Sequence, residues 1–138
     1  MDAKINEHVK NKKQDNLITA EIRYKMTAKG MMITEYYGAD SCVVLPDEIE
    51  GETVTALDDY AFARNLEVEE IWLPEALKEV GRYAFYRCKK KKKLILGNQL
   101  LDMGGGALTG CRLEEVEIYF REGKKSCLKS IVEEMRYQ

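Results

Sequence analysis

The sequence predicts an α/β repeat protein, a solenoid of short parallel strands with a cap at each end. Two observations carry this prediction. The segment Ala-Phe-Ala-Arg-Asn at 61–65 recurs at 84–88 and again, as Ala-Leu-Thr-Gly-Cys, at 107–111, so the copies are 23 residues apart. The apolar residues before each copy keep the same spacing, in the sets Val54, Leu77, Leu100 and Leu57, Val80, Met103. A fixed period of roughly 20–29 residues is typical of stacked coils, because one such coil cannot bury its own apolar face.

Each coil is predicted to contain one short strand. Ile71 and Leu73 alternate with Trp72, which places the first two on one face of a strand that Pro74 ends. The Ala84-Phe85 pair after the next turn is predicted to open a short helical or 3₁₀ segment with its apolar side towards the core.

The last strand departs from the period. The pattern Leu113-x-x-Val116-x-Ile118 repeats 68–73 at an offset of 45 rather than 46, so one residue is missing before this strand. This alignment makes Glu117 the equivalent of Trp72.

The repeat resembles a known family. Residues 73–88, LPEALKEVGRYAFYRC, are similar to the BspA-like leucine-rich repeat, and residues 33–62 resemble the first repeat of such arrays. The likeness covers roughly residues 30–120. It implies a right-handed leucine-rich-repeat solenoid and protein binding, often at bacterial or protist surfaces, with no common enzymatic activity and no functional residues to transfer. Three residues depart from the pattern and are predicted to weaken the core: Asn65, Lys91 and Leu108.

The chain is predicted to form one domain at 17–138 behind a polar tail at 1–16, which is disordered or a frayed helix. A β-hairpin cap at 17–38, with its turn at 27–30, precedes about three repeats at 39–120. Residues 121–138 carry apolar residues at the spacing of an amphipathic helix, which closes the other end: Leu128, Ile131, Val132 and Met135.

Composition excludes several classes of function. The 138 residues carry a net charge of −2, without the basic stripe typical of nucleic-acid binding, and no apolar run is long enough for a membrane span. The only histidine, His8, lies in the polar tail and no Cys-x-x-Cys motif is present, so we predict no metal, no cofactor and no enzymatic activity. The N-terminus has no signal-peptide core, which predicts a cytoplasmic protein; the alternative is a cell-surface protein whose signal has been removed.

The predicted partner-binding site is the outward face of the strands. Trp72 points outward, and its equivalents Val44, Ile95 and Glu117 should stack beside it, with Glu70 and Lys93 as a polar rim. Exposed apolar rows mark binding sites, and tryptophan is common at interface hot spots. The predicted partner is another protein. Two alternatives stay open: Trp72 merely covers its neighbours, or the row mediates self-assembly into a homo-oligomer.

Three further features have ordinary structural interpretations. The lysine run 89–93 faces acidic residues of the adjacent coils, at 67–70 and 114–115, and is expected to pair with them. Cys88 and Cys111 should stack about 5 Å apart as reduced thiols, although a disulfide stays open. The glycines at 104–106 lie at a repeat turn and lack the Gly-Lys-Ser/Thr sequence of a phosphate loop.

Overall fold

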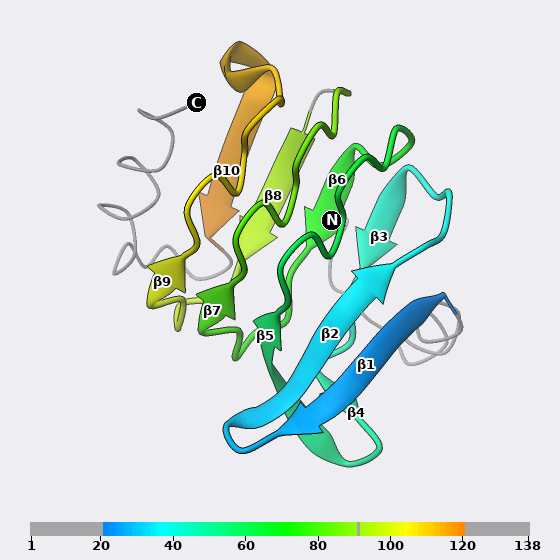
Figure 1. Ribbon diagram of the computed structural model, residues 1–138. Coiled ribbons are helices and arrows are strands. Elements are labelled where there is room, and N and C mark those ends of the chain that lie inside the picture. Colours follow the sequence, from blue (N-terminus) through cyan, green and yellow to red (C-terminus); the bar gives the residue numbers. More distant parts are fainter. Residues whose placement is uncertain (1–20, 91, 121–138) are drawn as a thin grey trace.

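The computed structural model describes residues 21–90 and 92–120, which form two sheets stacked coil by coil (Figure 1). The first, sheet A, has the order β1-β2-β5-β7-β9, with β4 paired to β5. Its strands are β1 (Ile22–Thr27), β2 (Gly30–Tyr36), β4 (Glu48–Ile49), β5 (Glu52–Leu57), β7 (Glu79–Val80) and β9 (Asp102–Met103). The second, sheet B, has the order β10-β8-β6-β3, with β3 (Cys42–Val44), β6 (Glu70–Trp72), β8 (Lys92–Leu96) and β10 (Val116–Phe120). A 3₁₀ turn, η2 (Leu113–Glu115), precedes β10.

The repeat spacing is reproduced as strand register. Ile71 pairs with Leu94 in sheet B, while Leu57 pairs with Val80 and Val80 with Met103 in sheet A, all in parallel. The described chain is therefore a β-solenoid, as the period predicts, and it has about four turns where the sequence analysis expected about three repeats. Each of the middle coils contributes a strand to both sheets, whereas the sequence analysis expected one strand per coil.

The N-terminal cap is the predicted hairpin. β1 and β2 pair antiparallel around a turn that joins Thr27 to Gly30, and β2 then pairs parallel with β5. The hairpin thus continues sheet A beyond the first coil and covers its open end. A register shift between Arg23 and Tyr24 allows Ile22 and Tyr36 both to be buried.

The Ala-Phe segments are turns, and the predicted helical or 3₁₀ segment is wrong. Successive i to i+3 hydrogen bonds join Ala63 N to Tyr60 O and Asn65 N to Phe62 O. Tyr60 and Arg64 both have positive φ, at 61°, which interrupts any right-handed helical run.

A column of large side chains fills the core beneath these turns. The rings of Tyr36 and Phe62 stack with centroids 5.2 Å apart, and Phe62 lies 5.5 Å from Phe85. Leu108 continues the column in the next coil and is fully buried. The smaller Leu108 is thus enclosed at the phenylalanine position, and the weakening expected there stays a prediction.

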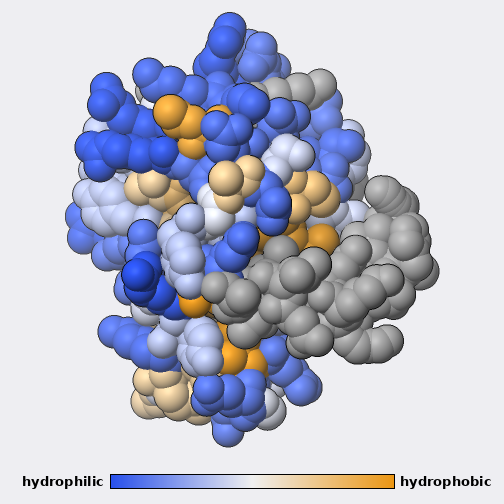
Figure 2. All heavy atoms as spheres, turned by 90° about the vertical axis from the view of Figure 1, so that its right-hand side faces the viewer, coloured by the Kyte–Doolittle hydropathy of each residue, from blue (hydrophilic) through white to orange (hydrophobic). Residues whose placement is uncertain are grey.

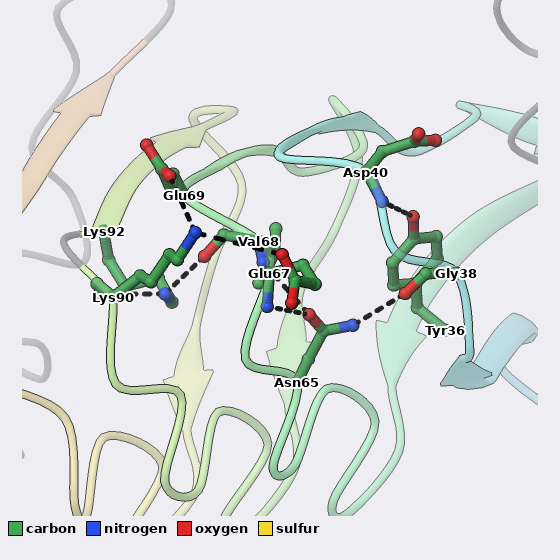
Figure 3. A network of polar contacts seen from close by, with 9 residues as sticks. All are labelled: Tyr36, Gly38, Asp40, Asn65, Glu67, Val68, Glu69, Lys90 and Lys92. Atoms are coloured by element: carbon green, nitrogen blue, oxygen red, sulfur yellow. Dashed lines mark hydrogen bonds and ion pairs between the residues drawn. The ribbon is translucent and has the colours of Figure 1, made fainter.

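The position after each Ala-Phe turn supplies a donor to the preceding coil. Cys88 Sγ donates to Phe62 O at 2.9 Å and Cys111 Sγ donates to Phe85 O at 3.1 Å. At the same position Asn65 Nδ2 donates to Gly38 O at 3.0 Å, while its Oδ1 accepts from two backbone amides of the following turn (Figure 3). Asn65 therefore takes the place of cysteine as the donor to the preceding segment, and the weakening expected at this position stays a prediction.

Two parts of the predicted architecture fall outside the described residues. These are the tail at 1–16 and the helix at 121–138. Lys91 also lies outside them. In the part of the chain that the structure describes, the regular elements are strands and the single 3₁₀ turn. The helix of the predicted α/β class was expected at 121–138, so it stays a prediction.

Close packing between coils leaves no room for a side chain at Gly81. A Cβ added to Gly81 would lie 2.4 Å from backbone atoms of Asp58 and Asp59, whereas a Cβ on Gly105 would meet nothing within 4 Å. We expect Gly81→Ala to lower the free energy of unfolding by about 1–3 kcal/mol, because the neighbouring backbone must move. Gly105→Ala, the matched control, should change it by less than about 1 kcal/mol. Urea unfolding of both variants tests this, and equal effects would contradict the close approach.

Candidate interaction face

The outward side of sheet B, which we call the strand face, is built from two rows of side chains. Strand pairing places Val44 beside Trp72, Trp72 beside Ile95 and Ile95 beside Tyr119. The second row runs parallel to the first and consists of Cys42, Glu70, Lys93 and Glu117. Four coils therefore contribute to one continuous face (Figure 1).

The predicted position of Glu117 is wrong by two residues. Glu117 pairs with Lys93, and Tyr119 takes the place beside Ile95 that the sequence analysis gave to Glu117. Leu94 and Ile118 are 24 residues apart, so the chain gains a residue before β10 instead of losing one. Inward and outward residues alternate with a period of two. A two-residue slip in register therefore leaves the apolar pattern unchanged, and the sequence does not reveal the slip.

The apolar row is less open than predicted. Val44 and Ile95 are only 7% and 6% exposed, and Trp72 between them is half-buried. Their place on either side of the indole accords with the alternative in which Trp72 covers its neighbours. Tyr119, which the sequence analysis missed, is the exposed aromatic residue of the row at 48%.

Polar contacts link the two rows. Trp72 Nε1 donates to Glu70 Oε2, and the hydroxyl of Tyr119 donates to Glu117 Oε1 at 3.1 Å. Lys93 Nζ lies 5.6 Å from the centre of the Tyr119 ring, a cation–π distance. A hollow of about 250 Å³ adjoins the charged row and is lined by Ser41, Cys42, Glu69, Glu70 and Lys93.

The lysine run divides into residues with different roles. Lys90 Nζ lies 3.5 Å from Glu69 and 3.9 Å from Glu67, which bears out the predicted pairing across coils for this residue (Figure 3). Lys92 is fully buried, and its Nζ donates to the carbonyl oxygens of Val68 and Lys90. The sequence analysis did not anticipate a buried lysine in β8. The run therefore does not form one uniform cationic patch.

Burial controls the protonation of the core thiols. It raises the pKa of Cys88 to about 12, and it also raises the pKa of Cys111, whereas burial lowers the pKa of Lys92. Cys88 and Cys111 are both free cysteines. At neutral pH a thiol with such a pKa is protonated and is a poor nucleophile, in contrast to the thiolates of catalytic cysteines.

Another concave region lies on the outer side of sheet A. This groove of about 680 Å³ is lined by Thr27, Ala28, Lys29, Met32, Thr55, Ala56, Lys78, Glu79 and Leu101. An ion pair of 3.5 Å joins Lys29 to Glu79 within it. Nothing in the repeat pattern pointed to this groove, because it depends on how the hairpin sits beside β5.

The described part of the chain contains neither a metal-binding cluster nor a helix that could span a membrane. Among residues 21–90 and 92–120, no group of three or more histidine, cysteine or acidic side chains is arranged to hold a metal ion. No described helix has the length and apolar character needed to cross a membrane.

Comparisons with known proteins agree with this geometry. The structure is similar to the leucine-rich repeat protein of T. pallidum, with a TM-score of 0.64 and 28% identity over 66% of this chain and 44% of that one. It also resembles a leucine-rich cell surface protein of Faecalibacterium prausnitzii A2-165, with a TM-score of 0.59 and 18% identity over 72% of this chain and 30% of the other. The chain thus spans less than half the length of either structure. Among curated proteins, none matches the sequence.

A family model supplies the remaining comparison. The model of the BspA type leucine-rich repeat region matches residues 44–133, which is more than half of the 138 residues. This range contains strands β4 to β10, whose register is described above. The chain therefore belongs to the BspA-type leucine-rich repeat family.

Proposed function

We propose that this protein is a non-catalytic protein-interaction module and that the strand face is its contact surface. Leucine-rich repeat domains are generally protein-interaction modules and generally lack enzymatic activity. The choice of face rests on the register of sheet B, which places the apolar row beside the charged row across four coils.

The chemistry of the face suits a protein partner. Trp72 and Tyr119 belong to the residue types that contribute most to binding hot spots. The charged row alternates in sign from Glu70 to Lys93 to Glu117, so a partner with the complementary order would be favoured in one alignment. Val44 and Ile95 then act as buried support for Trp72 rather than as contact residues.

The location of the partner is a separate question. The cytoplasmic location predicted from the N-terminus has no support in the comparisons. The F. prausnitzii structure is that of a cell surface protein. An envelope or extracellular protein is therefore the first partner to search for.

The test is affinity capture from both cytosolic and envelope fractions, read by mass spectrometry. We expect a partner captured by the wild type to be lost with Tyr119→Asp and with Lys93→Glu. The first change places a charge on the apolar row, and the second breaks the alternation of sign along the charged row. Met26→Asp is the matched control, since Met26 is 53% exposed on β1, outside the strand face. Circular dichroism verifies that each variant is folded. Retention of the same partner by both strand-face variants would rule out this face.

Self-assembly is the alternative function. Within the described residues, sheet B ends at β3 on one side and β10 on the other, and strand edges are sites of pairing between chains. Size-exclusion chromatography separates the two functions. A dimer that dissociates on Tyr119→Asp supports self-assembly, whereas a monomer that captures a different protein supports the interaction module.

A further inference from the structure

We propose a second binding site, at the turns between the sheets, that recognises carboxylates of an acidic peptide segment. Its residues come from two successive Ala-Phe turns, and we call them the turn ladder: Tyr60, Arg64, Tyr83, Tyr86 and Arg87. None of them belongs to the strand face, so this site does not depend on the function proposed above.

Backbone hydrogen bonds hold the turns in register. Tyr60 N donates to Arg82 O at 3.0 Å and Arg64 N donates to Tyr86 O at 2.6 Å. The same bonds recur one coil later, from Tyr83 N to Gly105 O and from Arg87 N to Thr109 O. Side chains at matching positions are therefore stacked at about the spacing of neighbouring strands.

The side chains form a preorganised cluster. Tyr60 and Tyr83 stack with centroids 5.4 Å apart and planes inclined by 17°, and Tyr86 meets both rings edge-on. The guanidinium groups of Arg64 and Arg87 lie 5.2 and 5.7 Å from the centre of the Tyr86 ring. The two cations are thus held close to one ring, although Tyr60 is 51% exposed and both arginines are exposed.

The ladder is built on an unfavourable backbone conformation. Tyr60, Arg64, Tyr83 and Arg87 have φ between 56° and 61°, and they account for four of the five non-glycine residues with positive φ in the described chain. The third coil has glycine at both matching positions, Gly106 and Gly110, also with positive φ. Glycine avoids the steric cost that other residues meet here, about 1 kcal/mol or more per residue. The first two coils thus carry strained residues where the third has glycine, and every strained side chain in these turns belongs to the cluster.

The third-coil glycines also make room for the ladder. A Cβ on Gly106 would lie 2.4 Å from the Tyr83 ring, and a Cβ on Gly110 would lie 2.9 Å from Arg87 Cγ. Tyr83 and Arg87 therefore lie over the turn of the next coil, which supports them from below.

The available groups select an anionic ligand. The faces of Tyr83 and Tyr86 are in contact with a ring or a guanidinium, so they offer little surface for stacking a sugar. The guanidinium N–H groups and the tyrosine hydroxyls remain, and a guanidinium is a planar donor that matches the two oxygens of a carboxylate. Within the described residues, no ion pair involves Arg64 or Arg87, so their charge is not already neutralised by a neighbour. An acidic peptide suits this site better than a polysaccharide.

The nearest acidic residues in sequence have other roles. Asp59 Oδ1 accepts from Arg82 N at 2.8 Å, and Asp58 Oδ1 accepts from Asp59 N at 2.8 Å. Both carboxylates stabilise the start of a turn.

The experiment uses the full chain and a fluorescein-labelled octapeptide of alternating glutamate and glycine, followed by fluorescence anisotropy. We expect Arg64→Gly/Arg87→Gly to weaken binding about tenfold or more, because two charge-assisted sets of hydrogen bonds are lost. The double variant should melt within about 5 °C of the wild type, because glycine relieves the strain at both positions. Binding should also weaken as the salt concentration rises.

Two controls decide the outcome. Lys25→Ala/Lys29→Ala removes two exposed charges from the hairpin and should leave binding unchanged, and the same peptide with glutamine in place of glutamate should not bind. The proposal is overturned if the wild type does not bind the acidic peptide, if the glutamine peptide binds equally, or if both double variants lose binding to the same extent. Tighter binding of polygalacturonate than of the peptide would instead assign the site to acidic polysaccharides.

Discussion

Phe85→Ala is expected to lower the free energy of unfolding by about 3–5 kcal/mol, the range for a fully buried phenylalanine. Phe85 is completely buried and lies in the central column of the core, 5.5 Å from Phe62. Its backbone amide also donates to Ala107 O at 2.9 Å, so the residue joins two coils. Truncation leaves a cavity that the hydrogen-bonded coils on either side cannot close. Urea denaturation monitored by circular dichroism measures the change.

Leu66→Ala is the control for this prediction. Leu66 is 55% exposed, so its truncation should change the free energy of unfolding by less than about 0.5 kcal/mol. If Phe85→Ala cost less than about 1 kcal/mol, the inward orientation of the Ala-Phe turn would be wrong.

Lys92→Glu is expected to destabilise the protein by about 3–5 kcal/mol, the magnitude for an uncompensated buried charge. The Lys92 ammonium is enclosed and donates to the carbonyl oxygens of Val68 and Lys90. A carboxylate at this place would meet two acceptors, and its charge would be both desolvated and repelled. Chemical denaturation again measures the effect.

Lys92→Met separates the role of charge from the role of volume. Methionine retains an unbranched apolar side chain and leaves only the two carbonyl groups without their donor, so we expect a cost of about 1–2 kcal/mol. Equal decreases in the free energy of unfolding for the methionine and glutamate variants would contradict this prediction. They would show that the two carbonyl groups do not disfavour a carboxylate at this position.

The fold was predictable because its main signal is long and repeated. Three copies of one apolar pattern specify the register of sheet A and most of sheet B, and the alternation around Ile22 and Tyr24 predicts the hairpin. The turn conformation was not predictable in the same way. Ala84 and Phe85 are compatible with a helical turn, and the positive φ of Tyr83 and Arg87 arises from stacking against the neighbouring coils.

The candidate site was predictable only in part. The register placed Val44, Trp72 and Ile95 together, but it could not reveal their burial, which depends on the space between side chains rather than on their direction. Tyr119 was missed because a two-residue slip preserves alternation. Lys92 was missed because the sequence places five lysines in a row and nothing in composition distinguishes the buried one.

The donor position shared by Asn65, Cys88 and Cys111 has a consequence for how such an array lengthens. Each coil offers a carbonyl oxygen to the coil that follows and receives a hydrogen-bond donor from it, whether amide or thiol. A duplicated 23-residue unit inserted between two coils would find an acceptor on one side and a donor on the other. Tandem duplication of a gene segment can therefore extend the molecule without redesign of either junction, and the number of coils becomes a variable on which selection can act.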